Sequence, residues 1–125
     1  MRILMAAFMI AFGPSAAAED AMLQTGEIYT ESYFSGETFL DLCRSQQPVA
    51  ISGCWRYING VIDALSAASS MTDGKVERLC IPTLATNPDR ADRVKGYLLL
   101  HPEEQKSNAA SVVIKALREA WPCTR

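Results

Sequence analysis

Four cysteines and one histidine are the residues of this sequence with the greatest capacity for chemistry: Cys43, Cys54, Cys80, Cys123 and His101. Thiolates and an imidazole can bind zinc or act as nucleophile and base, but metal-binding cysteines usually come in close pairs such as C-x-x-C. Here successive cysteines are 11, 26 and 43 residues apart, and no second imidazole is present. In an exported chain of this size, such cysteines predict two disulfides and no metal or other cofactor.

The other candidates for catalysis have structural interpretations. Glu103 with Glu104, and Asp89 with Asp92, are paired carboxylates. Both pairs lie at predicted helix starts, where acidic side chains interact favourably with the helix dipole. His101 directly precedes a proline and is predicted to be a turn or capping residue, and the sequence has no glycine-rich phosphate loop. We therefore expect a protein that is not an enzyme.

The N-terminus has the order of a secretory signal peptide, residues 1–18. Arg2 supplies a positive charge, residues 3–12 form an uncharged and mainly apolar run, and three alanines at 16–18 precede the first acidic residues. A membrane-spanning helix needs roughly 20 apolar residues, and this run is too short. We expect cleavage of the signal, export to the periplasm and no membrane insertion afterwards, leaving residues 19–125 as one small domain.

The charge balance argues against a nucleic-acid partner. The chain has 12 basic and 14 acidic side chains, giving a formal net charge of −2 at pH 7. Nucleic-acid binding normally requires a clustered basic face. We therefore expect no nucleic acid among its partners.

Turn residues and hydrophobic periodicity predict four helices and no strand. The first helix begins after Ser35 as N-cap, and the proline-containing segment 46–52 is expected to be a loop. The second helix covers residues 53–71, the third covers 87–100 with Asn87 as its cap, and the fourth begins at Pro102. Ala110, Val113, Ile114, Leu117 and Trp121 form the apolar stripe expected for the fourth helix. The predicted fold class is therefore all-α, a small disulfide-bridged four-helix domain.

Small residues mark the second predicted helix. Gly60, Ala64 and Ala67 could allow another backbone to approach closely. Glycine in a helix interior costs about 1 kcal/mol relative to alanine, so close packing is the expected reason for Gly60. The sequence leaves open whether that contact is intramolecular or belongs to a subunit interface.

The helix arrangement also predicts the disulfide pairing, for which four cysteines allow three patterns. Cys54 begins the second helix and Cys80 lies beyond its far end, about 26 Å away at 1.5 Å per residue, which is outside bridging range. A turn between the first two helices brings Cys43 to Cys54. Antiparallel third and fourth helices bring Cys80 to Cys123. The predicted pairs are Cys43–Cys54 and Cys80–Cys123.

Five segments of the chain follow one another in this order: YFSGETFLDLC (33–43), CWRYINGVIDAL (54–65), LCIP (79–82), VKGYLLLHPE (94–103) and SNAASVVIKALREAWPC (107–123). Together they resemble the Tai/Rap family of periplasmic immunity proteins, which protect bacteria against type VI secretion amidase effectors. The resemblance implies a fold similar to the acid-stress chaperone HdeA, often a homodimer. It also implies that the protein binds a peptidoglycan amidase effector and blocks its substrate groove sterically.

A polar loop after the second helix is the hypothesis for the blocking surface. Its residues are Met71, Thr72, Asp73, Gly74, Lys75 and Glu77. The helix face with Arg90, Arg93 and Lys95 is the next candidate, and both could equally be solvated surface. Two other functions stay open: a periplasmic acid-stress chaperone of the HdeA type, and an orphan envelope binding protein with this fold.

Overall fold

The computed structural model describes residues 34–124, and the predicted signal peptide lies outside this part of the chain. The prediction of an all-α fold is confirmed: within residues 34–124 no strand is formed, only an isolated bridge between Ser35 and Asn108. The helices are α2 (Gly36–Arg44), α3 (Pro48–Met71), α4 (Asn87–Leu100), the short 3-10 helix η1 (Pro102–Lys106) and α5 (Ala109–Ala120). None of the helices in residues 34–124 is both long and apolar enough to cross a membrane.

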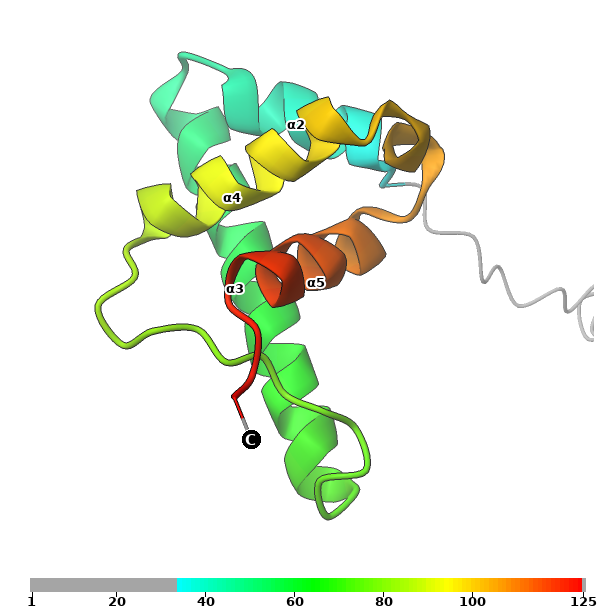
Figure 1. The fold of residues 1–125 in the computed structure, drawn as a ribbon. Coiled ribbons are helices and arrows are strands. Elements are labelled where there is room, and N and C mark those ends of the chain that lie inside the picture. Colours follow the sequence, from blue (N-terminus) through cyan, green and yellow to red (C-terminus); the bar gives the residue numbers. More distant parts are fainter. Residues whose placement is uncertain (1–33, 125) are drawn as a thin grey trace, which may run out of the picture. The chain divides into compact units, whose positions relative to one another are not determined.

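The helices pack around one core, with α2 in contact with α3, α4, η1 and α5. The N-terminal half of α3 packs in this bundle, while its C-terminal half extends past the other helices (Figure 1). The core consists of buried apolar side chains from all four α-helices: Phe39, Leu40, Cys43, Cys54, Ile58, Ala91, Val94, Leu98, Ala109, Val112, Val113, Ala116 and Leu117. Burial of this apolar surface is the main force that stabilises the domain.

The starts of α2 and α5 are held together by main-chain hydrogen bonds. The N–H of Gly36 donates to the carbonyl of Ser107 at 2.9 Å, and the N–H of Ala109 donates to the carbonyl of Phe34 at 2.9 Å. Ser35 caps α2 as predicted, because its side chain accepts a hydrogen bond from the N–H of Thr38. The two helices therefore begin side by side.

Two predicted helix starts need correction. In the predicted loop 46–52, residues 48–52 are helical, since α3 begins at Pro48. Proline fits there because the first residues of a helix need no N–H partner and its φ is already suitable. In α4 the N-cap is Thr86 rather than Asn87, and Thr86 and Asp89 exchange hydrogen bonds in a capping box.

The fourth predicted helix is two elements. The 3-10 helix η1 ends at Lys106, and Asn108 then caps α5 by accepting from the N–H groups of Ala110 and Ser111. This restart changes which side chains are buried. Ala110 and Ile114, expected in the core, are half-buried, while Ala109, Val112 and Ala116 are buried.

Both predicted disulfides are present. Cys43–Cys54 joins the end of α2 to the first half of α3, with a Cα–Cα distance of 5.0 Å, and lies in the core. Cys80–Cys123 joins the segment before α4 to the end of the described chain, with a Cα–Cα distance of 5.2 Å. All four cysteines of the sequence are paired.

Replacing Gly36 by alanine should destabilise the domain by about 1–3 kcal/mol, the usual cost of overpacking a core. A Cβ at Gly36 would lie 2.7 Å from the carbonyl oxygen of Glu104 and 3.2 Å from the Cα of Gln105, and neither backbone atom can rotate away. Gly96→Ala is the matched control, because a Cβ at Gly96 meets no atom within 4 Å. Urea unfolding followed by circular dichroism measures both. Equal midpoints for the two variants would contradict the close approach at Gly36.

Candidate partner-binding surface

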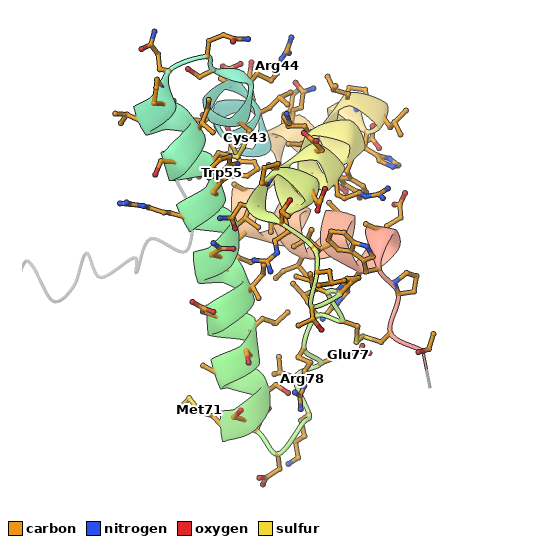
Figure 2. All side chains as sticks on the ribbon, turned by 90° about the vertical axis from the view of Figure 1, so that its left-hand side faces the viewer. Cys43, Arg44, Trp55, Met71, Glu77 and Arg78 are labelled. Atoms are coloured by element: carbon orange, nitrogen blue, oxygen red, sulfur yellow. A yellow bond between two sulfur atoms is a disulfide. The ribbon has the colours of Figure 1, made fainter. Side chains whose placement is uncertain are left out.

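The end of α3 and the turn after it form an exposed tip. Met71 is 85% exposed, and Asp73, Gly74 and Lys75 are also exposed. The predicted site residues lie on two sides of this tip: Met71 projects from the side of α3 that faces away from Glu77 (Figure 2). The structure therefore brings the predicted residues close in space without placing them on one surface.

The turn has a defined backbone conformation. Asp73 has φ 50° and Gly74 has φ 79°, and the N–H of Gly74 donates to the carbonyl of Ser69 at 2.8 Å. This is the pattern of a Schellman C-cap, which satisfies carbonyls that the end of a helix would leave free. A non-glycine side chain at position 74 would strain this conformation.

The side chain of Thr72 stabilises the turn through hydrogen bonds within the loop. Its hydroxyl donates to the carbonyl of Ala68 at 2.7 Å and accepts from the N–H of Val76 at 3.1 Å. The residue is half-buried. Thr72 therefore contributes to the conformation of the turn, and its role in partner binding stays a prediction.

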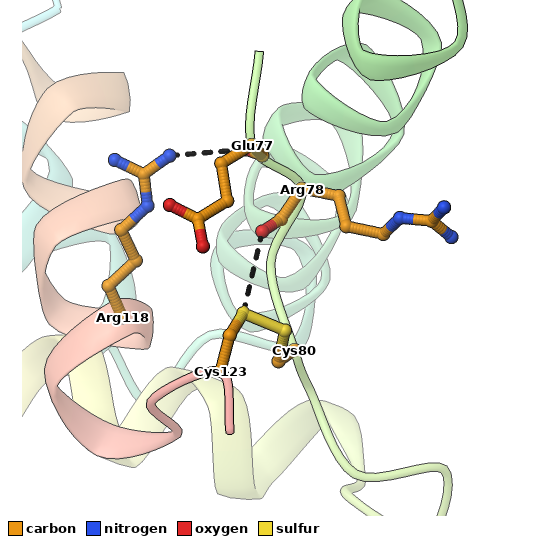
Figure 3. Close-up of a disulfide and its surroundings, with 5 residues drawn as sticks. All are labelled: Glu77, Arg78, Cys80, Arg118 and Cys123. Carbon is orange, nitrogen blue, oxygen red and sulfur yellow. Dashed lines mark hydrogen bonds between the residues drawn. A yellow bond between two sulfur atoms is a disulfide. The ribbon is translucent and has the colours of Figure 1, made fainter. Parts of the chain in front are cut away.

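The far end of the loop is attached to the end of α5 (Figure 3). The guanidinium of Arg118 donates to the carbonyl of Glu77 at 3.1 Å, and the Cys80–Cys123 disulfide follows three residues later. The Sγ of Cys123 also lies 3.8 Å from the carbonyl oxygen of Arg78. A disulfide sulfur has no proton to donate, so this last approach is a packing contact. We call residues 72–80 the anchored loop, because both of its ends are fixed to the helices.

In the second candidate surface, the cationic face of α4, each cationic side chain contacts a neighbouring side chain, and Arg93 is exposed. Arg90 donates to the side-chain oxygen of Asn59 at 2.8 Å, and the guanidinium of Arg93 lies 5.7 Å from the ring centre of Trp121. Lys95 pairs with Asp92 at 2.9 Å. The three cationic side chains are therefore each engaged by a neighbour within the domain.

An apolar groove between α3 and α5 was not predicted from the sequence. Its volume is about 550 Å³, and it is lined by Arg56, Tyr57, Gly60, Val61, Ala64, Leu65, Ala68, Ala110 and Ile114. Burial raises the pKa of the Tyr57 phenol, in spite of an opposing hydrogen bond with the backbone of Ala110. The sequence signal for this groove was the run of small residues on α3, which here border open space instead of a packed helix.

His101 has a structural role at the end of α4 in the described part of the chain. It is the C-cap of α4, its ring lies 4.3 Å from that of Tyr97, and Nδ1 is 3.3 Å from Glu103. The prediction of a capping histidine is confirmed. Among residues 34–124, no group of histidine, cysteine, aspartate and glutamate side chains is arranged to hold a metal ion.

The family model of Rap1a immunity proteins matches residues 35–123, which is nearly all of the described part of the chain. No curated protein matches the chain.

Proposed function

The chain belongs to the family of Rap1a immunity proteins, and from this premise we propose that it binds a peptidoglycan amidase effector of type VI secretion and blocks its substrate groove. An immunity protein acts by binding a secreted effector. Steric blocking requires a rigid convex element that fits a groove and needs no chemistry of its own. Because steric blocking needs no catalytic residues, family membership supports the proposal that this protein is an inhibitor and not an enzyme.

The anchored loop is the observation that carries this proposal. The Schellman turn fixes its start, and Arg118 together with the Cys80–Cys123 disulfide fixes its end. Between these points Asp73, Lys75 and Glu77 are exposed. A loop that is already ordered loses little conformational entropy on binding, so more of the contact energy is retained as affinity.

The two disulfides support the proposed location. Disulfides persist in oxidising compartments such as the bacterial periplasm, and all four cysteines of the chain are paired. We propose that residues 1–18 are removed during export and that residues 19–125 act in the periplasm, where peptidoglycan is exposed to an amidase.

The proposed function is tested with the mature, oxidised protein, residues 19–125, as bait in lysate of its source organism. We expect recovery of a small cell-wall amidase whose hydrolysis of peptidoglycan is suppressed by an equimolar amount of the bait. Recovery of an amidase that remains fully active in the complex would contradict steric blocking. If no amidase is recovered, the amidase proposal is wrong for this chain.

Replacing Asp73, Lys75 and Glu77 together by alanine should raise the dissociation constant for that amidase at least about tenfold, which corresponds to about 1.4 kcal/mol. These side chains are exposed, so the main effect on the free energy of unfolding should come from alanine at the left-handed φ of 50° at position 73, a cost of about 1 kcal/mol. Isothermal titration calorimetry measures the affinity. The matched control replaces exposed Glu37, Asp41 and Lys106, which removes the same charges far from the loop. Equal affinities for the two triple variants would exclude the loop.

A further inference from the structure

The apolar groove between α3 and α5 has a single charged residue among those that line it. The groove follows α3 from Arg56 to Ala68, which is about 18 Å at 1.5 Å per residue. Arg56 lies at one end of this stretch, next to Tyr57, and every other lining residue has an apolar side chain or none. The groove therefore has a polar end, at Arg56 and Tyr57, and is apolar over the rest of its length.

The charge at the polar end is not neutralised by the described part of the chain. Arg56 is exposed, and no carboxylate of residues 34–124 forms an ion pair with it. Ala110, on the α5 side of the groove, is the second residue of its helix, and the N-terminal end of a helix favours negative charge. Tyr57 lies beside Ala110, because its phenol forms a hydrogen bond with the backbone of that residue. The polar end is therefore suited to one anionic group.

The apolar part of the groove has small residues along α3. Gly60, Ala64 and Ala68 line the groove at four-residue spacing, which places them on one side of the helix. A Cβ on Gly60 would meet no atom of the described chain within 4 Å. An apolar ligand can therefore lie against α3 here without displacing a side chain.

The walls of the groove provide no hydrogen bonds for a peptide backbone beyond the polar end. Both walls are helices, whose main-chain N–H and C=O groups bond to one another along the helix. An extended peptide would leave its own N–H and C=O groups without partners, which is costly in an apolar site. A single acyl chain has no such groups, and the carboxylate of a fatty acid is confined to one end. The distribution of charge in the groove matches that of a fatty acid.

We propose that this groove binds the anion of a free long-chain fatty acid, with its carboxylate at Arg56 and Tyr57 and its acyl chain along Gly60, Ala64 and Ala68. The volume of about 550 Å³ lies within the range of small-molecule pockets, about 300–1,000 Å³. Each methylene group that is fully removed from water strengthens binding about fourfold. No residue of the anchored loop lines the groove, so this site is additional to the proposed blocking surface.

Isothermal titration calorimetry with dodecanoate below its micelle concentration tests the site in the mature, oxidised protein, residues 19–125. We expect saturable binding at one site per chain. Decanoate is two methylene groups shorter and should bind about tenfold more weakly. Dodecanol has no charge to pair with Arg56 and should bind several-fold more weakly than dodecanoate. No saturable binding of dodecanoate up to about 1 mM would overturn the proposal.

A substitution at Gly60 tests the apolar part of the groove. The side chain of Gly60→Leu would occupy the space of the acyl chain, so dodecanoate should bind at least about tenfold more weakly. This leucine has space within the described chain, and circular dichroism should show an intact fold. Gly96→Leu is the matched control, because Gly96 of α4 also borders open space but does not line this groove. Equal affinities of the two variants for dodecanoate would overturn the proposed position of the acyl chain.

A substitution at Arg56 tests the polar end. Arg56→Gln should weaken the binding of dodecanoate several-fold, because the carboxylate loses its cationic partner. The same variant should bind dodecanol with unchanged affinity, since the alcohol carries no charge. An equal loss for both ligands would show that Arg56 acts on the shape of the groove and would overturn its role in binding the carboxylate.

Two further results would assign the groove to another occupant and overturn the proposal. Co-sedimentation of the protein with phosphatidylglycerol vesicles, without binding of dodecanoate, would indicate a membrane surface. Loss of dodecanoate binding as the protein concentration and the sedimenting mass rise together would indicate that a second copy of the chain covers the groove. None of these results depends on whether the protein inhibits an amidase.

Discussion

Replacing Cys80 and Cys123 together by alanine should lower the free energy of unfolding by about 4 kcal/mol and should also weaken binding to the effector. The bridge closes a loop of 43 residues, and the chain-entropy model assigns about 4 kcal/mol to a loop of that length. The bridge is also one of the two attachments at the far end of the anchored loop. Without it only the hydrogen bond from Arg118 to the carbonyl of Glu77 remains there.

Removing the other disulfide, Cys43–Cys54, is the control that distinguishes an effect on stability from an effect on binding. Cys43–Cys54 closes a loop of 11 residues, for which the same model gives about 3 kcal/mol. Its cysteines are 7% and 1% exposed and join α2 to α3 in the core, away from the anchored loop. Cys43→Ala/Cys54→Ala should therefore cost comparable stability, while the molecules that remain folded should bind the effector with unchanged affinity.

Urea unfolding followed by circular dichroism measures the free energy of unfolding. Isothermal titration calorimetry, at a temperature where both variants are folded, measures the affinity for the effector. The expected result is two destabilised proteins, of which only Cys80→Ala/Cys123→Ala loses affinity, by about tenfold or more. Equal affinity losses in the two double variants would show that the Cys80–Cys123 bridge acts through global stability alone. Unchanged affinity in Cys80→Ala/Cys123→Ala would show that the bridge does not position the loop.

The parts of the fold that follow from local chemistry could be predicted from the sequence. Ser35 caps α2 as expected, and α3 and α4 end at Met71 and Leu100 as predicted. The disulfide pairing followed from the length of α3, because a rigid helix separates Cys54 from Cys80. Each of these features depends on short-range interactions or on the fixed geometry of a helix.

The predictions that were wrong, at the starts of α3 and α5, concern features that short-range interactions alone do not decide. Pro48 is compatible both with a loop and with the first turn of a helix, and the residue type alone does not decide between them. The division of the fourth predicted helix depends on Ser107 and Ala109 pairing with the segment before α2, a contact between residues about 70 positions apart. Asn108 is a local cap signal for the restart, but the long-range pairing has no signal in the local sequence.

The exposure of the residues in the candidate surface was predicted only in part. Asp73, Lys75 and Glu77 lie in an exposed loop as expected, but the inward role of Thr72 depends on a hydrogen bond to Val76 that spacing does not reveal. The small residues of α3 were recognised, yet the sequence could not show whether Gly60 packs within the chain. That answer required the position of every other helix, since it depends on an absence of neighbours among the described residues.

Leu98→Ala should be among the most damaging single substitutions in the described domain, with an expected cost of about 3–5 kcal/mol. The sequence places three leucines in succession at the end of α4, and helical periodicity turns only one of them to the core. Leu98 is 0% exposed and lies in the main apolar cluster, whereas Leu99 is 58% and Leu100 is 78% exposed. Truncation at Leu98 removes buried methyl groups and leaves a cavity among rigid neighbours.

Leu100→Ala is the matched control, because it makes the same chemical change two residues away on the same helix. It should cost less than about 0.5 kcal/mol, the usual range for surface substitutions. Urea unfolding of the oxidised proteins gives both values under conditions in which the disulfides stay closed. A difference below about 1 kcal/mol between the two variants would mean that α4 presents another face to the core. In that case the burial of Val94, one turn earlier on the same face, would be wrong as well.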